Sequence, residues 1–575
     1  MPFGYHGCYL RIDVTAGSAE RVPIPDAVLR QYIGGSGLGA RLLLDQRAAV
    51  TDPLSPDAPL VFAFSPLVGS PLTTSAKFAV VSRSPLTERF NDSLASSGFA
   101  IACKRCGCDA IVVVGRAPSL SVLIIDDGEI RLEAADDVRG DTCQVAEEKL
   151  RARLGTDYRI ASIGPAGERA VLYATISHDG RHAGRGGSGA VLGSKNIKAI
   201  AVRGTHYCEW ARPRELTELS RDLSKRSFGP ATAKYRELGT AANLLTFNRL
   251  GTLPTRNFQS GTFADAPKIS AEQLSVERSR TRASCVACTI GCEHIYSTGR
   301  SSVRLEYESL FALGSLCGVA DSDAVLRASQ RCDELGIDTI SAGGTIAFAM
   351  ECVERGVLDE PWLTFGSGDA VLKAIDLIGR REGIGRLLAE GSRRAAEAIG
   401  QGSLAFAPQV KGLEIPGYEP RALQTMALGF AVGARGADHN RSGAYEVDFS
   451  EKVDRRNATL DSVSHAIETE DKAALMDSLI LCKFLRGVFT DFHAEAAVML
   501  QAVTGWDVTA DELRETARRI VATKRQVNLL AGWTPEEDTL PERFLDAPLS
   551  TDPGALLTRA RLQELVAEYH RQRGW

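Results

Sequence analysis

The sequence predicts an α+β protein in which a β-rich N-terminal domain is followed by two mainly helical domains. Its 575 residues are too many for a single hydrophobic core, so several domains are expected. Short β-like segments are common up to residue 207, and beyond it apolar residues recur at three- and four-residue spacing, which is typical of helices. We expect domains over residues 1–207, 208–405 and 406–575, with the second boundary in a loop at 402–407.

Four segments of the first domain have the patterns of strands. They are residues 10–14, 110–114, 122–132 and 198–202. The first alternates apolar and polar side chains, as a half-buried strand does, and the second is a short apolar run typical of a buried strand. The third contains Asp127-Gly128, a pair that favours a two-residue hairpin turn.

Four segments of the later domains have the spacing of helices. They are residues 323–335, 369–378, 385–399 and 511–530. Gly379 and Gly400 come directly after two of these segments. Because a helix C-terminus favours glycine, we expect each of them to end its helix.

Composition excludes some classes of protein. Hydrophobic content of 44% and charged content of 24% are ordinary for a soluble globular chain. The net charge of −5 provides no basic surface for nucleic acid and no polybasic membrane patch. The first residues contain no apolar signal segment, and no apolar run reaches the length of a membrane span. We therefore expect a cytoplasmic enzyme with reduced thiols.

The most informative motif is Cys285-Val-Ala-Cys288-Thr-Ile-Gly-Cys292, with a distant candidate partner at Cys482. Three thiolates at this spacing can surround one face of a small metal centre, and a 4Fe–4S cluster needs a fourth, one for each iron. Zinc and a chance cluster remain alternatives, although a structural zinc site usually pairs two short motifs, and only Cys285 and Cys288 have the usual form. A cluster implies redox chemistry and a partner for its electrons.

A second group of cysteines, Cys103, Cys106 and Cys108, is also dense in thiols. It could bind another metal, but no fourth ligand is apparent, so we favour a chance cluster that leads into the strand at residue 110.

Glycine is concentrated in two runs, at residues 34–39 and 184–189. Both are typical of tight turns, and glycine also lets backbone N–H groups approach a phosphate. In the run at residues 184–189, Arg185 favours phosphate binding, because a guanidinium among glycines suits an anionic ligand.

Short motifs in a consistent order extend over nearly the whole chain. They are residues 4–39, 84–87, 109–112, 162–168, 184–196, 285–292, 306–309, 332–338, 435–439 and 540–544. In this order they resemble the aldehyde ferredoxin oxidoreductase family of tungsten or molybdenum pterin enzymes. The resemblance implies that the β-rich domain is a base on which two pterins hold one metal, and that the helical domains cover this base and supply a 4Fe–4S cluster through Cys285, Cys288, Cys292 and Cys482.

The resemblance also implies a set of residues that contact the pterins. They are Lys77, Arg185, Gly186, Gly187, Asp333, Gly336, Ile337, Asp338, Arg435, Asp477 and Leu481. At three positions the sequence departs from the family pattern. Ile480 replaces a family glycine, Lys77 stands where the family often has arginine, and Leu94 replaces an asparagine near a magnesium ion, so magnesium is an optional cofactor here. Without the resemblance, residues 333–338 would be interpreted as a helix end, and Lys77 as a solvated lysine.

Glu308 and His439 are the catalytic candidates. Oxidation of an aldehyde to an acid removes two electrons and needs water or an oxo group and proton transfers. Glu308 could activate the water or take a proton, and His439 could donate to the carbonyl oxygen. The alternatives are a capping carboxylate and a structural histidine.

The expected function is therefore an oxidoreductase that interconverts a small aldehyde and a carboxylic acid and passes electrons to ferredoxin or a similar carrier. A non-catalytic electron-transfer or scaffold subunit of the same fold is one alternative, which the presence of Glu308 and His439 disfavours. A second alternative is an enzyme of this family that acts on another substrate, such as an aromatic thioester. The departures at Lys77, Leu94 and Ile480 keep this alternative open. We expect neither nucleic acid nor membrane as a partner, and a homo-oligomer is compatible with the sequence. Tungsten versus molybdenum, the substrate and the acceptor remain open.

Overall fold

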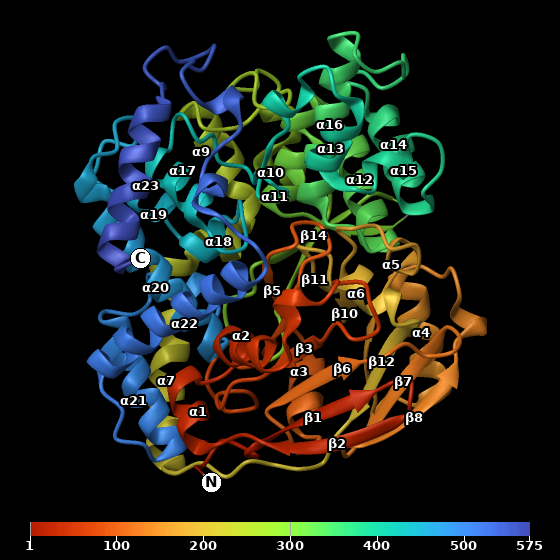
Figure 1. The fold of residues 1–575 in the computed structure, drawn as a ribbon, viewed down its shortest axis with the longest axis vertical. Coiled ribbons are helices and arrows are strands. Elements are labelled where there is room, and N and C mark those ends of the chain that lie inside the picture. Colours follow the sequence, from red (N-terminus) through yellow and green to blue (C-terminus); the bar gives the residue numbers. More distant parts are fainter. Residues whose placement is uncertain (1, 300) are drawn as a thin grey trace.

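Two six-stranded sheets form the N-terminal part of the chain (Figure 1). The computed structural model describes residues 2–299 and 301–575. The first sheet has the order β2-β1-β6-β3-β4-β5, and the second has the order β11-β10-β9-β12-β7-β8. The strands are β1 (Cys8–Asp13), β2 (Ser18–Pro23), β3 (Leu60–Ala63), β4 (Lys77–Arg83), β5 (Phe90–Ser96), β6 (Ala110–Val114), β7 (Ser121–Asp126), β8 (Glu129–Ala134), β9 (Arg159–Ser162), β10 (Ile176–His178), β11 (Arg181–Ala183) and β12 (Ile197–Arg203).

The sheets stack in layers because alternate side chains of a strand point to opposite faces. Ile111 and Val113 of β6 enter a core shared by the two sheets, whereas Ala110 and Val112 enter a core on the other face of the first sheet. The helices of this part are α1 (Asp26–Tyr32), α2 (Gly35–Asp45), α3 (Gly98–Lys104), α4 (Cys143–Leu154), α5 (Pro165–Glu168) and α6 (Ser188–Ser194). Side chains of α3 and α6 contribute to the shared core, α2 covers the first sheet, and α4 covers the second.

All four predicted strand segments are confirmed. Residues 122–132 form the hairpin β7–β8, in which Asp127 and Gly128 have φ of +50° and +93°. Two residues with positive φ are what a tight hairpin turn of this kind requires.

The rest of the chain is mostly helical, as the sequence predicts. The helices are α7 (Pro213–Ser227), α8 (Ala233–Leu238), α9 (Asn243–Arg249), α10 (Ala271–Glu277), α11 (Tyr307–Leu313), α12 (Ser322–Leu335), α13 (Thr339–Glu354), α14 (Gly368–Arg380), α15 (Gly385–Leu388), α16 (Gly391–Ile399), α17 (Gln424–Val432), α18 (His439–Ser442), α19 (Tyr445–Asp448), α20 (Leu460–Leu479), α21 (Phe492–Thr504), α22 (Ala510–Leu530) and α23 (Arg559–Arg573). A three-stranded sheet, β13 (Arg280–Ala283), β14 (Glu293–Ser297) and β15 (Ser302–Arg304), and the pair β16 (Gln409–Val410) and β17 (Leu413–Glu414) were not expected from the sequence.

Two helix predictions are wrong in detail. The segment 385–399 is not one helix, because Gly391, with φ of +84°, separates α15 from α16. Gly379 does not end its helix: α14 continues to Arg380, and a Cβ at Gly379 would lie 2.8 Å from a methyl group of Leu335, so the glycine allows α12 and α14 to pack closely. Gly400 does end α16, with φ of +70°.

The first glycine run begins α2 rather than forming a turn between elements. A Cβ at Gly37 would lie 2.5 Å from the carbonyl oxygen of Tyr32, and one at Gly35 would lie 2.3 Å from that of Asp477. The run therefore lets α2 fit closely against its neighbours, including α20.

In the part of the chain that the structure describes, no helix has both the length and the apolar character needed to cross a membrane.

Candidate functional site

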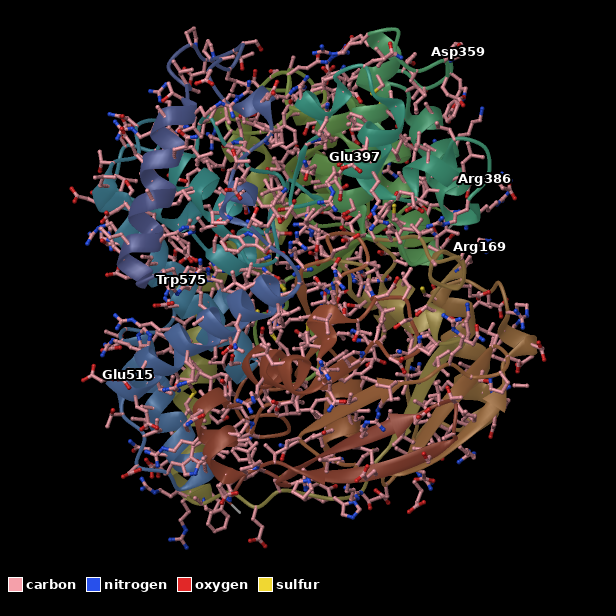
Figure 2. All side chains as sticks on the ribbon, viewed as in Figure 1. Arg169, Asp359, Arg386, Glu397, Glu515 and Trp575 are labelled. Carbon is pink, nitrogen blue, oxygen red and sulfur yellow. The ribbon has the colours of Figure 1, made fainter. Side chains whose placement is uncertain are left out.

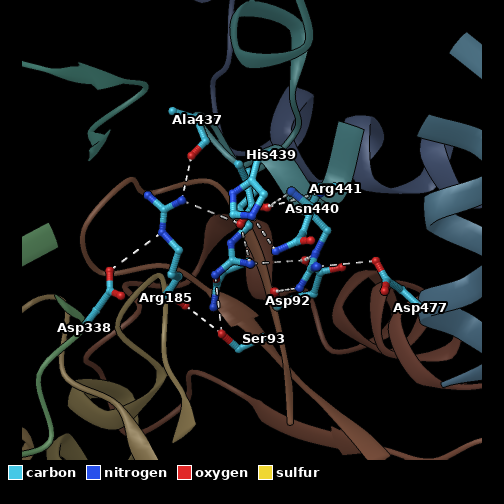
Figure 3. A network of polar contacts seen from close by, with 12 residues as sticks. Asp92, Ser93, Arg185, Asp338, Ala437, His439, Asn440, Arg441 and Asp477 are labelled. Atoms are coloured by element: carbon cyan, nitrogen blue, oxygen red, sulfur yellow. Dashed lines mark hydrogen bonds and ion pairs between the residues drawn. The ribbon is translucent and has the colours of Figure 1, made fainter. Parts of the chain in front are cut away.

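A buried carboxylate, Asp92, lies at the centre of a polar network between the first sheet and the helical half (Figure 3). Its oxygens accept hydrogen bonds from Arg441 Nε at 2.6 Å and Lys524 Nζ at 2.8 Å, and from the Ser36 hydroxyl. Arg435 Nη1 is 4.0 Å away. Burial would raise the pKa of Asp92, but the positive charges of Arg441, Lys524 and Arg435 outweigh burial and hold this pKa well below its usual range.

The loop before α18 brings several charged residues to this network. Asp438 caps α18 by accepting from the backbone N–H groups of Asn440 and Arg441. The same carboxylate lies 3.0 Å from Arg435 Nη1, so one acid both starts the helix and fixes the arginine. The sequence Arg-Gly-Ala-Asp-His thus folds so that Arg435 contacts the sheet at Asp92 and Ser93, with His439 four residues later at the start of α18.

Arg185 enters the network from the second glycine run. Its guanidinium donates to the carbonyl oxygen of Ala437 at 2.8 Å and to that of Glu414, and lies 3.7 Å from Asp338 (Figure 3). Gly186 and Gly187 have φ of +85° and +81°, a left-handed conformation that favours glycine. These two positions let the backbone turn so that Arg185 points toward the helical half.

The same glycines permit a close approach to two neighbouring segments, β5 for Gly186 and the backbone at Leu172 for Gly187. A Cβ at Gly186 would lie 1.9 Å from Asn91 Oδ1, and one at Gly187 would lie 2.1 Å from the carbonyl oxygen of Leu172. Ser93 in turn donates to the carbonyl oxygen of Arg185 at 2.9 Å.

Several polar atoms of the network are buried without a hydrogen-bond partner among the described residues. They are Arg185 Nε, Arg435 Nε, Asn91 Oδ1 and Asp477 Oδ2. A buried polar atom without a partner costs about 1–3 kcal/mol, so such atoms gathered in one place indicate a ligand that supplies partners. Two guanidinium donors suit an anionic group such as a phosphate, and the two acceptors suit N–H groups. The residues present therefore fit a pterin that carries phosphate.

Residues 333–338, which include four of the predicted pterin contacts, are both a helix end and part of this region. α12 ends at Gly336, with φ of +72°, and Asp338 then caps α13 by accepting from Ser341 N at 3.1 Å. Ile337 pairs with Ala174 of the base in an isolated backbone bridge. The capping interpretation and the family interpretation are thus compatible.

His182, which sequence reasoning missed, lies beside this segment. Its Nδ1 is 2.9 Å from the hydroxyl of Thr175, and its Nε2 is 3.3 Å from Asp333. A lone histidine in a sequence carries no signal of such a contact.

Residues 477–482, which include the predicted pterin contacts Asp477 and Leu481, keep the backbone conformation of a glycine at position 480, although isoleucine stands there. Ile480 ends α20 with φ of +63°, which costs a β-branched residue about 1–2 kcal/mol. Gly35 provides room for its side chain, because a Cβ there would lie 2.5 Å from Ile480 Cδ1. Asp477 is buried beside Lys483 Nζ at 2.9 Å, whereas Leu481 lies in a hydrophobic core.

The four cysteines of the main motif lie close to one another. Cys285, Cys288 and Cys292 occupy the connection between β13 and β14, and Cys482 follows α20. Burial, and then the negative charge that a Cys482 thiolate would carry, raise the pKa of Cys288 to about 11, and the same two causes raise the pKa of Cys292. Deprotonation of these thiols would therefore need a compensating positive charge, such as iron.

A short segment before β4 joins the two parts of the motif. Thr74 N donates to the carbonyl oxygen of Ala287 at 2.5 Å, and Thr74 Oγ1 accepts from Cys482 N at 3.2 Å. Thr73 Oγ1 lies 2.9 Å from Thr289 Oγ1. Lys77, three residues later, is half-buried and forms no ion pair within the described ranges.

The described residues contain no three His, Cys, Asp or Glu side chains arranged around one ion position. Cys103, Cys106 and Cys108 are buried in the core between the two sheets, where Cys106 and Cys108 have backbone carbonyl oxygens as partners. Their arrangement agrees with a packing role.

Glu308 and His439 come together from α11 and α18. Gly417 N donates to Glu308 Oε2 at 3.1 Å, while Oε1 lies 3.6 Å from His439 Nε2. Burial raises the pKa of Glu308 to about 8 and lowers the pKa of His439 to about 3. At neutral pH the carboxyl is therefore mostly protonated and the imidazole is neutral.

The hydrogen bonds around His439 indicate its tautomer. Arg486 Nη2 lies 3.4 Å from Asn440 Oδ1, which orients the amide so that its Nδ2 donates to His439 Nε2 at 2.9 Å. Nε2 then accepts, and Nδ1 carries the proton. Nδ1 is buried and has no partner in the described structure, so it is a free hydrogen-bond donor.

Aromatic rings surround this pair. Tyr418 stacks on His439 with ring centroids 4.8 Å apart, and Tyr445 lies 5.0 Å from Tyr418. Tyr307 and Phe247 extend the cluster, 5.0 Å from each other. These rings exclude water and account for the two opposite pKa shifts.

Comparison with known proteins identifies the chain as an oxidoreductase. Residues 9–204 match the N-terminal domain of aldehyde ferredoxin oxidoreductase, and residues 218–575 match its domains 2 and 3. The chain belongs to the aldehyde ferredoxin oxidoreductase family.

Alignments with named relatives cover the full length of this chain. The tungsten-containing aldehyde ferredoxin oxidoreductases of Pyrococcus furiosus and Pyrococcus horikoshii are 35% and 36% identical, and each alignment covers 100% of this chain and 96% of the relative. The WOR-like subunit of an aliphatic sulfonate oxidoreductase from Pyrococcus furiosus is 28% identical, over 100% of this chain and 95% of the relative. The fold is also that of the active site complex BamBC of benzoyl coenzyme A reductase, with a TM-score of 0.84 and 23% identity over 100% of this chain and 95% of that one.

The central position of Asp92 leads to a prediction about stability. Asp92→Asn keeps the size of the side chain but leaves Arg441, Lys524 and Arg435 without their shared negative charge. We expect a loss of about 3–5 kcal/mol, because breaking a buried ion pair leaves uncompensated charge. Thermal unfolding followed by circular dichroism measures it. The control is Asp45→Asn, which breaks an exposed pair with Arg41 and should cost less than about 1 kcal/mol; equal midpoints for the two variants would contradict the assignment.

Proposed function

We propose that this chain is a tungsten- or molybdenum-pterin oxidoreductase that interconverts an aldehyde and a carboxylic acid. In the forward direction, an aldehyde and water become the acid, two electrons and two protons. Cys285, Cys288, Cys292 and Cys482 would hold a 4Fe–4S cluster, which would supply the route for these electrons to ferredoxin or a similar carrier. The observation that carries the proposal is the approach of Glu308 and His439 to each other beside a buried network of charged side chains, in which Arg185 Nε and Arg435 Nε have no hydrogen-bond partner among the described residues.

The base would hold two pterins and their metal. The residues assigned to this role are Lys77, Arg185, Gly186, Gly187, Asp333, Gly336, Ile337, Asp338, Arg435, Asp477 and Leu481. Arg185 and Arg435 are suited to phosphate, because the Nε of each is buried without a hydrogen-bond partner in the described structure. When bound, the metal supplies Lewis acidity and two-electron exchange. Leu94 has no ligand atom in its side chain, so the proposal does not require magnesium.

The two catalytic side chains divide the remaining work. The Nδ1–H group of His439 donates a hydrogen bond to the carbonyl oxygen of the aldehyde. Glu308, in its ionised form, accepts a proton from the attacking water. The aromatic rings around both side chains strengthen these interactions by excluding water.

A second candidate function keeps the cofactors but changes the substrate. The departures at Lys77, Leu94 and Ile480 favour it, and the names of two similar proteins, a sulfonate oxidoreductase subunit and a benzoyl coenzyme A reductase complex, are consistent with such variation within the fold. A non-catalytic subunit is disfavoured, because Glu308 and His439 are both present and lie next to each other, His439 buried and Glu308 partly buried.

Anaerobically purified protein tests the function. We expect tungsten or molybdenum with about two pterins per metal, and reduction of a viologen dye that depends on an aldehyde. A broad panel of aldehydes, sulfonates and aromatic thioesters separates the two candidates. Active protein that lacks both metals would contradict the proposal.

The proposed ligand set leads to a prediction about the cluster. Cys482→Ser should weaken or shift the electron paramagnetic resonance signal of the reduced protein, because a hydroxyl replaces one thiolate of four. The matched control is Cys352→Ser, at a buried cysteine outside the motif, which should leave the signal unchanged. Protein that contains stoichiometric zinc and no iron would refute the cluster.

Glu308 leads to a prediction about pH. Because its pKa is raised to about 8, the ionised base becomes more populated as the pH rises, so kcat/KM should increase about tenfold per unit below pH 8 and level off above it. Glu308→Gln should lower kcat by about two to four orders of magnitude and abolish this dependence. His439→Ala should lower kcat as well, with metal content near wild type in both variants.

The control for this prediction is Glu306→Gln, which changes an exposed carboxylate two residues away. It should retain the activity and the pH profile. If Glu308→Gln and His439→Ala both keep wild-type turnover, neither residue belongs to the mechanism.

A further inference from the structure

The cysteine motif lies at the surface of the protein. The connection between β13 and β14 that contains Cys285, Cys288 and Cys292 includes Val286, which is 45% exposed. β13 is an edge strand of its three-stranded sheet, and its first three residues are exposed. A cluster bound here would lie within reach of an external electron carrier.

Two helices flank this connection. Ser227, the last residue of α7, places its hydroxyl 2.6 Å from that of Thr289. On α8, the carbonyl oxygen of Tyr235 lies 3.1 Å from His294 Nε2, and the Tyr235 ring stacks on Phe484, two residues after Cys482, at 4.1 Å. The end of α7, α8 and β13 therefore form one continuous surface around the motif.

This surface is positively charged. Residues 225–239 and 276–292 together contain seven Lys or Arg residues and two Asp or Glu residues, in a chain whose net charge is −5. We call five of these cations the basic face. They are Lys225, Lys234, Arg236, Arg280 and Arg282. None of the five has an acidic partner among residues 2–299 and 301–575.

Neutral groups hold some of these cations in place. Arg236 donates to the Thr232 hydroxyl and to the carbonyl oxygen of Gly229, and its guanidinium lies 4.4 Å from the ring centroid of Phe228. Arg280 and Arg282 are two residues apart on β13, so their side chains point to the same side of the strand. Their charges remain available to a partner.

Apolar side chains complete the surface. Phe228 is 57% exposed and Val276 is 84% exposed, and Val286 lies between the cysteines. Exposed apolar groups interspersed with unpaired cations are typical of a small, transient protein interface.

We propose that the basic face docks a small electron-carrier protein whose surface is acidic around its own redox centre. The proposal rests on the cluster proposed above. One electron passes from the reduced cluster to the oxidised carrier, so the cluster loses one electron and the carrier gains one, and no bond or proton changes. Opposite charges accelerate the encounter and orient the two centres, at a rate that falls as salt screens them.

A second copy of the chain is a poorer occupant. A two-fold dimer through this surface would place each basic face against its own equivalent, and like charges would repel.

Electron transfer without substrate provides the test. Protein reduced with dithionite and freed of excess reductant is mixed in a stopped-flow instrument with an oxidised acidic [2Fe–2S] ferredoxin. For the wild type we expect the second-order rate constant to fall by about tenfold or more when the salt rises from about 20 mM to about 500 mM. Arg280→Glu/Arg282→Glu should lower the low-salt rate constant by about tenfold or more and flatten its salt dependence, with iron content and cluster spectrum unchanged.

The matched control is Arg380→Glu/Arg386→Glu, which changes the charge by the same amount on exposed residues of α14 and α15. Figure 2 shows Arg386 at the outer edge of the helical half. The rate constant of this control for electron transfer to ferredoxin should stay within about twofold of the wild-type value. A basic cytochrome c provides the opposite test, because the Arg280→Glu/Arg282→Glu variant should reduce it faster than the wild type does.

Unchanged ferredoxin rates in Arg280→Glu/Arg282→Glu would overturn the proposal. A wild-type dimer in light scattering that becomes monomeric in this variant would also overturn it, since the face would then join two copies. Aldehyde-dependent viologen reduction is measured separately. If it fails while salt-dependent transfer to ferredoxin remains, the proposed function is wrong and the docking face is supported.

Discussion

The site depends on one buried charge, the carboxylate of Asp92. It is fully buried on β5 and contacts Arg441 and Lys524, which lie 349 and 432 positions away in the sequence. An isolated carboxylate at this depth would be costly, so the sheet side of the interface requires the cations of the helical half and those cations require the carboxylate. This mutual requirement brings the turn that contains Arg435 and His439 to the base.

The same burial acts on the two catalytic candidates in opposite directions. A low-dielectric environment disfavours the charged form of any group, so it raises the pKa of Glu308 and lowers that of His439. The result is a protonated acid beside a neutral imidazole, which is suited to proton exchange near neutral pH. Asn440 determines the tautomer of His439, because its amide donates to Nε2 and leaves the proton on Nδ1, where no described group accepts it.

Direct contacts connect the cysteine motif to the base domain. Thr73 and Thr74 contact the cysteine motif on one side and lead into β4 of the base on the other, with the half-buried Lys77 at the junction. The motif itself opens onto the basic face. Thr73 and Thr74 therefore connect the cysteine motif to the base.

The sequence alone determined what depends on local pattern. The two-residue period of strands, the Asp127-Gly128 turn and the three- and four-residue period of α12, α14 and α22 are local properties, and so is the spacing of Cys285, Cys288 and Cys292. The ordered motifs were sufficient to identify the family. Tertiary packing decided the rest. Gly379 allows close packing against Leu335 instead of ending its helix, and Gly35 leaves room for Ile480 in its glycine-like conformation. The contact of His182 with Asp333 and the partners of Asp92 could not be predicted, because contacts between residues distant in the sequence leave no local pattern.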